Sequence, residues 1–149
     1  MSSTSKEPEG RSDRASQEQK RNSATILVVE DNWVAREIVK ATLENGGYSV
    51  LFAANASAAL KIMGTRTCAL VLLDLLPAGE EGATLLQRLR RLPGREEMPI
   101  VAFSAFVSLL DDLKKLDAGF SAYIAKPVDP QSLIRIVEAH MRNAAPKQD

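Results

Sequence analysis

The chain has 149 residues, of which 45% are hydrophobic and 26% charged, a composition typical of a single globular domain with a buried core. Its formal net charge is zero, which argues against general electrostatic binding to nucleic acid or to an anionic membrane. The single cysteine, Cys68, excludes an internal disulfide, and no apolar run approaches the length of a transmembrane helix, so we expect a cytoplasmic location and no membrane insertion.

The first 23 residues differ in composition from the rest of the chain. They are rich in Ser, Lys, Arg, Glu and Gln, and their only aliphatic side chains are those of Met1 and Ala15. Such a segment buries too little apolar surface to offset its ordering entropy. We expect a disordered tail over 1–23, serving as a solvated extension or a docking tail, one domain over 24–143 and a short C-terminal tail over 144–149.

The ordered part is predicted to begin with a strand over 26–29, a run rich in β-branched residues. Asn32 is suited to cap a helix that ends before the glycine pair at 46–47. A strand over 48–53 follows, and then a helix that is capped by Asn55 or Ser57 and stopped by Gly64. We expect the buried face of the first helix to comprise Ala35, Ile38, Val39, Thr42 and Leu43.

The central stretch Leu70–Leu76 runs through four aliphatic residues into Asp74, and a loop with Pro77, Gly79 and Gly82 follows. A continuous apolar run bounded by turn residues indicates a strand buried on both faces, as in a parallel sheet. An acid at the carboxyl end of such a strand lies where open α/β sheets place their reactive groups.

The second half repeats the alternation of helix and strand. A leucine-rich helix ends at Pro93-Gly94, a strand over 100–103 runs into Ser104, and a strand over 122–125 runs into Lys126. Between these strands, a helix striped by Leu109, Leu113 and Leu116 stops near Gly119. Asp129 and Pro130 begin the last helix, whose apolar face carries His140 as a core or boundary residue.

Five strands joined by helices with short connections predict a doubly wound, flavodoxin-like (βα)5 fold: a five-stranded parallel sheet with helices on both faces. Four strands end in polar groups: Glu30-Asp31, Asp74, Ser104 and Lys126. The carboxyl ends of parallel strands share one edge, so these groups are expected to converge. Clustered carboxylates repel one another, and Mg²⁺, which prefers oxygen ligands, relieves that repulsion.

With such a cation, Asp74 can act as a nucleophile toward a phosphoryl group, giving an aspartyl phosphate. Lys126 can pair with Asp74 and then with a phosphoryl oxygen, and Ser104 can donate a hydrogen bond to another. In this combination of motifs the chain resembles the receiver domain of bacterial two-component response regulators over about residues 24–143.

The resemblance implies a Mg²⁺ site and a phosphoacceptor. Glu30, Asp31 and Asp74 would hold the ion, Glu30 through water, and the backbone carbonyl of Leu76 would be a further ligand. Asp74 would take the phosphoryl group from the phosphohistidine of a sensor histidine kinase or a histidine phosphotransfer protein. Such a domain is a signalling module that catalyses only its own phosphorylation and dephosphorylation.

The resemblance also assigns the groups that respond to phosphorylation. Ser104 and Lys126 would bind the phosphoryl oxygens, and Tyr123 matches the switch aromatic, which turns inward as Ser104 moves. The Lys126–Pro127 bond is expected to be cis. Because few residues follow the last helix, we expect a stand-alone receiver that acts through a downstream protein target or a phosphorelay, without direct contact to nucleic acid.

Some positions depart from the family or are open to two interpretations. Pro77 stands three residues after Asp74 instead of four, and apolar Leu76 and Phe106 occupy positions that tune the phosphoryl lifetime, which predicts slow dephosphorylation. Trp33 is either an exposed helix-start residue or an anchor for a partner. Three alternatives are open. The chain could be a Mg²⁺-dependent phosphohydrolase, although the usual second acid of such enzymes is replaced by Leu76, or a flavin-binding protein of the same fold, although no phosphate-binding loop follows the first strand. It could also be an inactive pseudo-receiver.

Overall fold

The computed structural model describes residues 24–75 and 79–144, so the predicted tails and the loop with Leu76 and Pro77 lie outside the described residues. Strands and helices alternate in the described part of the chain. The elements are β1 (Thr25–Val29), α2 (Trp33–Asn45), β2 (Ser49–Ala53), α3 (Ala56–Thr65), β3 (Leu70–Asp74), α4 (Gly79–Arg90), β4 (Ile100–Ser104), α5 (Val107–Lys115), β5 (Ala122–Ala125) and α6 (Pro130–Ala144). None of the described helices is long and apolar enough to cross a membrane.

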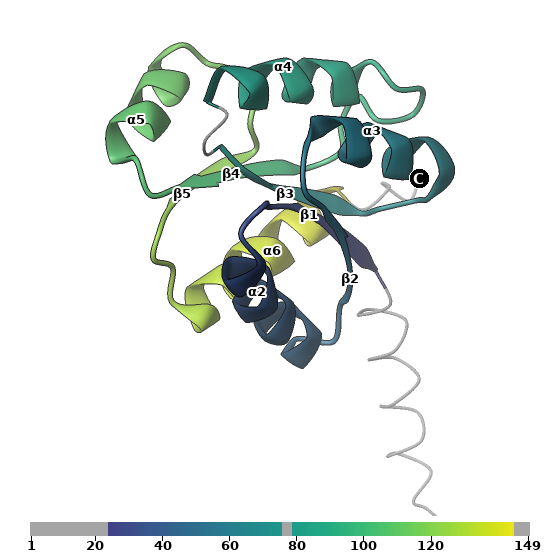
Figure 1. Ribbon diagram of the computed structural model, residues 1–149, viewed down its shortest axis with the longest axis vertical. Coiled ribbons are helices and arrows are strands. Elements are labelled where there is room, and N and C mark those ends of the chain that lie inside the picture. Colours follow the sequence, from purple (N-terminus) through teal and green to yellow (C-terminus); the bar gives the residue numbers. More distant parts are fainter. Residues whose placement is uncertain (1–23, 76–78, 145–149) are drawn as a thin grey trace, which may run out of the picture.

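The strands form one sheet in the order β2-β1-β3-β4-β5, and every neighbouring pair is parallel. Helices α3, α4 and α5 cover one face of the sheet, and α2 and α6 cover the other (Figure 1). The chain adds β2 on one side of β1 and β3 on the other, so the order of strand addition changes direction at β1. Open α/β sheets place their sites at such a switch point. The predicted flavodoxin-like, doubly wound fold is confirmed.

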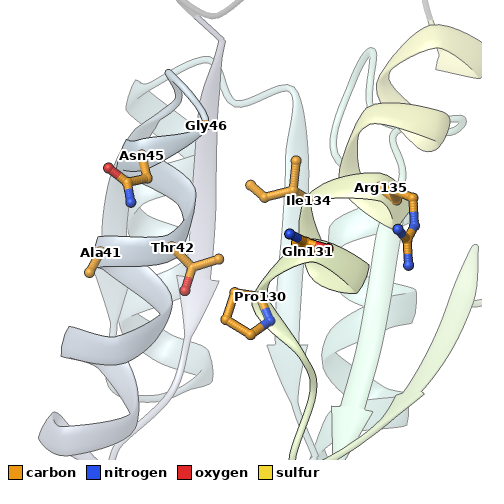
Figure 2. A pocket seen from close by; sticks show the side chains of 8 residues that line it. All are labelled: Ala41, Thr42, Asn45, Gly46, Pro130, Gln131, Ile134 and Arg135. Carbon is orange, nitrogen blue, oxygen red and sulfur yellow. The ribbon is translucent and has the colours of Figure 1, made fainter.

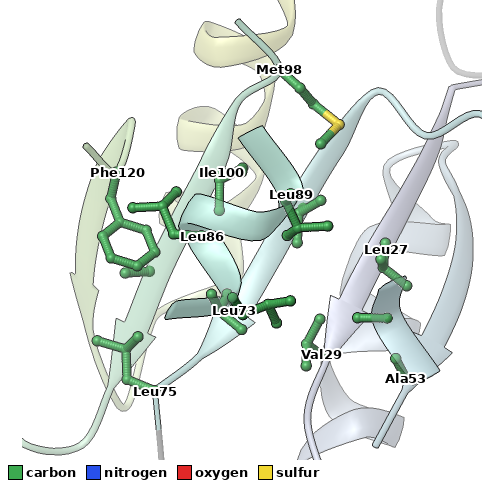
Figure 3. Close-up of a cluster of buried hydrophobic side chains, with 14 of the residues drawn as sticks. Leu27, Val29, Ala53, Leu73, Leu75, Leu86, Leu89, Met98, Ile100 and Phe120 are labelled. Atoms are coloured by element: carbon green, nitrogen blue, oxygen red, sulfur yellow. The ribbon is translucent and has the colours of Figure 1, made fainter. Parts of the chain in front are cut away.

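The core consists of two clusters, one on each face of the sheet. Successive residues of a strand alternate between them, as Ile100 and Ala102 do on one face and Val101 and Phe103 on the other. Figure 3 shows the first cluster, in which leucines of α4 lie over the sheet. All five positions of β3 and of β4 are buried, so the continuous apolar run at 70–74 is a strand covered on both faces.

The predicted helix caps are present. The Asn32 side chain accepts a hydrogen bond from the Ala35 amide at 2.9 Å, and Asp129 accepts one from the Ser132 amide at 3.0 Å. Asn55, rather than Ser57, caps α3 by accepting from the Ala58 amide at 2.8 Å. These caps end the loops that follow β1, β2 and β5.

Three sequence expectations are wrong. Gly64 does not stop α3, which runs to Thr65 and ends where Arg66 turns extended, because a single glycine weakens a helix without breaking it. Ile38 is 61% exposed, since α2 buries only the narrower face that holds Val39 and Leu43.

Leu116 is 74% exposed, although the leucine stripe of this helix placed it in the core. It is the C-cap of α5, and the next residue, Asp117, has a φ of 52° that turns the chain. The Ala118 amide then bonds the Leu113 carbonyl at 3.1 Å. The helix has therefore ended before Leu116 can reach the core, and Leu110 and Leu113 are its buried residues.

Candidate functional site

Three acidic side chains meet at the carboxyl ends of β1 and β3, which are neighbours in the sheet. One carboxylate oxygen from each of Glu30, Asp31 and Asp74 lies within 4.8 Å of the others. Glu30 is 2% exposed and Asp74 is 7% exposed, whereas Asp31 is exposed. The sheet thus brings together acids that are more than 40 residues apart in the sequence, as their positions at strand ends predicted.

Lys126 reaches the same point from β5. Its Nζ lies 2.9 Å from Glu30 Oε1 and 3.3 Å from Asp74 Oδ2, and 4.4 Å from the centroid of the Phe103 ring. The Lys126 amide donates to the Ser104 carbonyl at 2.9 Å, which continues the β4–β5 ladder, and the Lys126–Pro127 bond is cis, as expected. Sequence reasoning anticipated the pairing with Asp74 and missed the shorter contact with Glu30.

The environment of Glu30 favours its ionised form. Burial alone would raise the pKa of this carboxyl, but the hydrogen bonds that it accepts from Lys126 and from the Asn32 amide favour its charged form, and the pKa is lowered. The Asn32 amide donates to Glu30 Oε2 at 3.2 Å. Glu30 therefore enters the site as a fixed anion, bonded through both carboxylate oxygens.

Ser104 ends β4 with its side chain fully buried. Its Oγ accepts a hydrogen bond from the Phe106 amide at 3.0 Å. A serine hydroxyl has one hydrogen of its own, and accepting a bond leaves that hydrogen for another acceptor. Ser104 can therefore donate to an anion at the strand ends while the chain at Phe106 holds it in place.

A cavity of about 700 Å³ opens above these groups. Its lining joins the acids and Lys126 to the start of α2 and to the β4–α5 connection. The lining residues are Glu30, Asp31, Asn32, Val34, Ala35, Ile38, Asp74, Phe106 and Lys126. The cavity is accessible from outside and has ionised groups at its base, which suits a small anion bound together with a cation.

Exposed apolar side chains line this cavity or adjoin, in the sequence, the residues that line it. Six large hydrophobic residues are exposed in the part of the chain that the structure describes, and five belong to two neighbouring segments. We call these five, Trp33, Val34, Ile38, Phe106 and Val107, the apolar rim. The sequence predicted Trp33 as an exposed residue or a partner anchor and Phe106 as a residue that tunes the phosphoryl lifetime, but it placed Ile38 in the core. The available signal for Ile38 was its spacing of one helical turn from Val34, which puts the two side chains on the same side of α2.

The remaining predicted residues lie away from the acids or outside the description. Tyr123 lies in β5, beside Ala102 of β4, and is partly buried. The Leu76 carbonyl lies outside the described residues. His140 is a boundary residue whose ring nitrogens lie 2.9 Å from the Ile136 carbonyl oxygen and 3.1 Å from that of Ser121.

A second cavity, of about 570 Å³, lies between α2 and α6 (Figure 2). The residues that line it include Thr42, Gln131, Ile134 and Arg135, and none of its lining residues is acidic. It contains none of the groups that the strand ends supply, so the cavity above Asp74 is the candidate functional site.

Comparison with known proteins agrees with this geometry. The family model of the response regulator receiver domain matches residues 26–138. An uncharacterised 14.6 kDa protein of Leptolyngbya boryana is 36% identical over 115 residues, which are 77% of this chain and 88% of that protein. The phosphate regulon transcriptional regulatory protein PhoB of Pseudomonas aeruginosa is 33% identical over 122 residues, 82% of this chain but only 53% of that regulator.

Among solved structures, a CheY-like response regulator receiver domain protein from Methanospirillum hungatei JF-1 matches with a TM-score of 0.73 and 30% identity, covering 83% of this chain and 97% of that one. The match of the family model, the identity with relatives and the shared fold agree with one another. The chain belongs to the response regulator receiver domain family of two-component systems.

Proposed function

We propose that Asp74 accepts a phosphoryl group, in a Mg²⁺-dependent reaction, from the phosphohistidine of a sensor kinase or a phosphotransfer protein. The observation that carries this proposal is the position of Asp74: at the base of an open cavity, with Lys126 Nζ 3.3 Å from its carboxylate and two further acids beside it. A carboxylate held this way can act as a nucleophile toward phosphorus.

The residues present fit a divalent cation. Lys126 supplies one positive charge to a group of three carboxylates, so the cluster retains an excess of negative charge. Carboxylate oxygens are the ligands that Mg²⁺ prefers. Glu30, Asp31 and Asp74 would hold the ion, with the Leu76 carbonyl as a further ligand. Bound there, Mg²⁺ would neutralise charge on the phosphoryl group as it transfers.

The transfer step exchanges one bond to phosphorus for another. An oxygen of the Asp74 carboxylate attacks phosphorus, the P–N bond of the phosphohistidine breaks, and its electron pair remains on the imidazole nitrogen. The product is an acyl phosphate on Asp74 and a histidine restored on the donor. Lys126 releases Asp74 Oδ2 and binds a phosphoryl oxygen, and Ser104 donates its hydroxyl hydrogen to another.

The partner that donates the phosphoryl group is a protein that contacts the apolar rim. Trp33 is 67% exposed and Ile38 is 61% exposed; both lie on α2, where Ile38 lines the cavity and Trp33 precedes the lining residue Val34. A small phosphodonor needs only the base of the cavity, whereas a protein can bury these side chains as it presents its histidine. Output would follow from a protein target that responds to the rearrangement of Ser104 and Tyr123.

The alternatives draw less support from the site. A phosphohydrolase of the kind considered above needs a second acid at position 76, where the chain has Leu. Direct contact with nucleic acid is not favoured by a chain of zero net charge. Relatives are named transcriptional regulators, and this chain spans about half of their length, so we confine the proposal to phosphoryl transfer and protein contacts in the cytoplasm.

The test is incubation with acetyl phosphate and Mg²⁺, followed by intact-mass measurement. The wild type should gain one phosphoryl group, and Asp74→Asn should gain none. Asp112→Asn, which removes an exposed acid on α5, is the matched control and should be labelled like the wild type. Labelling that persists in Asp74→Asn would refute the acceptor, and a wild type that is never labelled would identify a pseudo-receiver.

A further inference from the structure

The ring of Tyr123 is held by two side chains from outside its own strand. Lys114 Nζ, from the last turn of α5, lies 5.8 Å from the centroid of the ring. Phe120, a buried residue of the loop before β5, meets the ring edge-on, with centroids 5.6 Å apart and ring planes at 71°. A cation within about 6 Å of an aromatic centroid is attracted to it. Tyr123 therefore has one apolar and one cationic neighbour.

The same ring lies on the face of the sheet to which Ser104 points. Tyr123 is paired with Ala102 of β4, and Ala102 and Ser104 are two residues apart on one strand, so their side chains share a face. Tyr123 and Ala102 both pack in the cluster beneath α3, α4 and α5. A movement of Ser104 thus occurs on the side of the sheet where Tyr123 is positioned.

In this structure, side chains of the Asp74 site pair with one another or with the backbone. Lys126 pairs with Asp74, and the Ser104 hydroxyl accepts from the Phe106 amide. In this arrangement the Lys114 ammonium also lies over the Tyr123 ring.

We propose that Lys114 is a positioning residue: a Tyr123 ring that turns inward moves away from the ammonium, so the contact holds Tyr123 and sets how readily a phosphoryl group at Asp74 reorganises the α5–β5 surface. The inference rests on the proposed function, because it takes Tyr123 as the switch. An exposed cation–π contact shifts an equilibrium about two- to fivefold. By thermodynamic linkage, removing the contact should strengthen the binding of a phosphoryl mimic by the same factor.

The experiment is calorimetric titration of the full chain with beryllofluoride, a phosphoryl mimic, in the presence of Mg²⁺. Lys114→Met should lower the dissociation constant about two- to fivefold. Lys114→Arg keeps a cation above the ring and should bind like the wild type. Lys115→Met removes the neighbouring exposed charge from the same turn, without a ring contact, and should also bind like the wild type.

A double-mutant cycle separates positioning from a general effect of charge. In a Tyr123→Leu background there is no ring face, so Lys114→Met should change nothing. An equal effect of Lys114→Met and Lys115→Met, or an effect that persists beside Leu, would overturn the inference. Binding by the wild type with no effect of Lys114→Met overturns this inference alone; a wild type that does not bind beryllofluoride overturns the proposed function as well.

Discussion

The base of the Asp74 cavity and its apolar rim are built in different ways. At the base, Glu30, Asp74 and Ser104 are buried, come from strand ends and are fixed by bonds to Lys126 or to backbone amides. On the rim, apolar side chains from the start of α2 and the β4–α5 connection are exposed. The difference separates chemistry from recognition: the base should be needed for every phosphodonor, and the rim only for a protein.

The largest effect is expected at Lys126. Lys126→Met should slow labelling by acetyl phosphate about 100-fold or more, because a positioned donor to the reacting oxygens is lost. It also leaves the buried carboxylates of Glu30 and Asp74 without their cation, so we expect a loss of about 1–3 kcal/mol in unfolding free energy, partly restored by Mg²⁺. Labelling rates and thermal melts with and without Mg²⁺ check this; Lys126→Arg, which keeps the charge, should melt nearer the wild type.

A change at the rim should spare the chemistry. Ile38→Ser should weaken phosphotransfer from a protein donor about tenfold, the effect of losing a good interface anchor, and leave labelling by acetyl phosphate unchanged. Leu116→Ser alters a leucine that is 74% exposed and not part of the rim, so it is the matched control. Equal loss with both donors would place Ile38 with the base of the cavity and end the distinction.

Phe106 belongs to both regions, because its amide holds Ser104 and its ring lines the cavity. We expect slow hydrolysis of the acyl phosphate in the wild type. Phe106→Asn keeps the amide but replaces the ring with a group that can orient water, and should speed hydrolysis on the order of tenfold. The loss of the phosphoryl label over time measures the rate of hydrolysis, and Val107→Asn is the control. A wild-type half-life of seconds with Mg²⁺ would contradict the expectation of slow hydrolysis.

The smallest effect is a signal from Trp33, the single tryptophan in the sequence. It lies two residues after Asp31, so its fluorescence should change in a saturable way as Mg²⁺ binds. The same titration of Asp31→Asn should shift to higher Mg²⁺ concentrations. If the wild type responds to neither Mg²⁺ nor beryllofluoride, Trp33 is only an exposed helix-start residue.

The sequence predicts the base of the cavity better than its rim, and the physics explains why. Strand ends and caps depend on neighbouring residues, so Asn32, Asp74 and Asp129 could be placed from local patterns. Whether Ile38 is buried depends on how far α6 and the sheet cover α2, and Leu116 depends on where α5 turns. The contact of Lys126 with Glu30 depends on side-chain reach across β1, β3 and β4, which spacing along the chain does not encode.

Gly82, in the first turn of α4, lies so close to Leu75 that the size of the residue at this position affects where Asp74, the proposed phosphoacceptor, is held. A Cβ at this position would lie 2.5 Å from Cδ2 of Leu75, well inside a normal carbon–carbon contact. Leu75 is fully buried, follows Asp74 directly and donates its amide to the Phe103 carbonyl at 3.1 Å, so it has little room to yield (Figure 3). One added methyl group at residue 82 should therefore displace Leu75 and, with it, the neighbouring nucleophile Asp74, although every charged residue of the site is still present in the sequence.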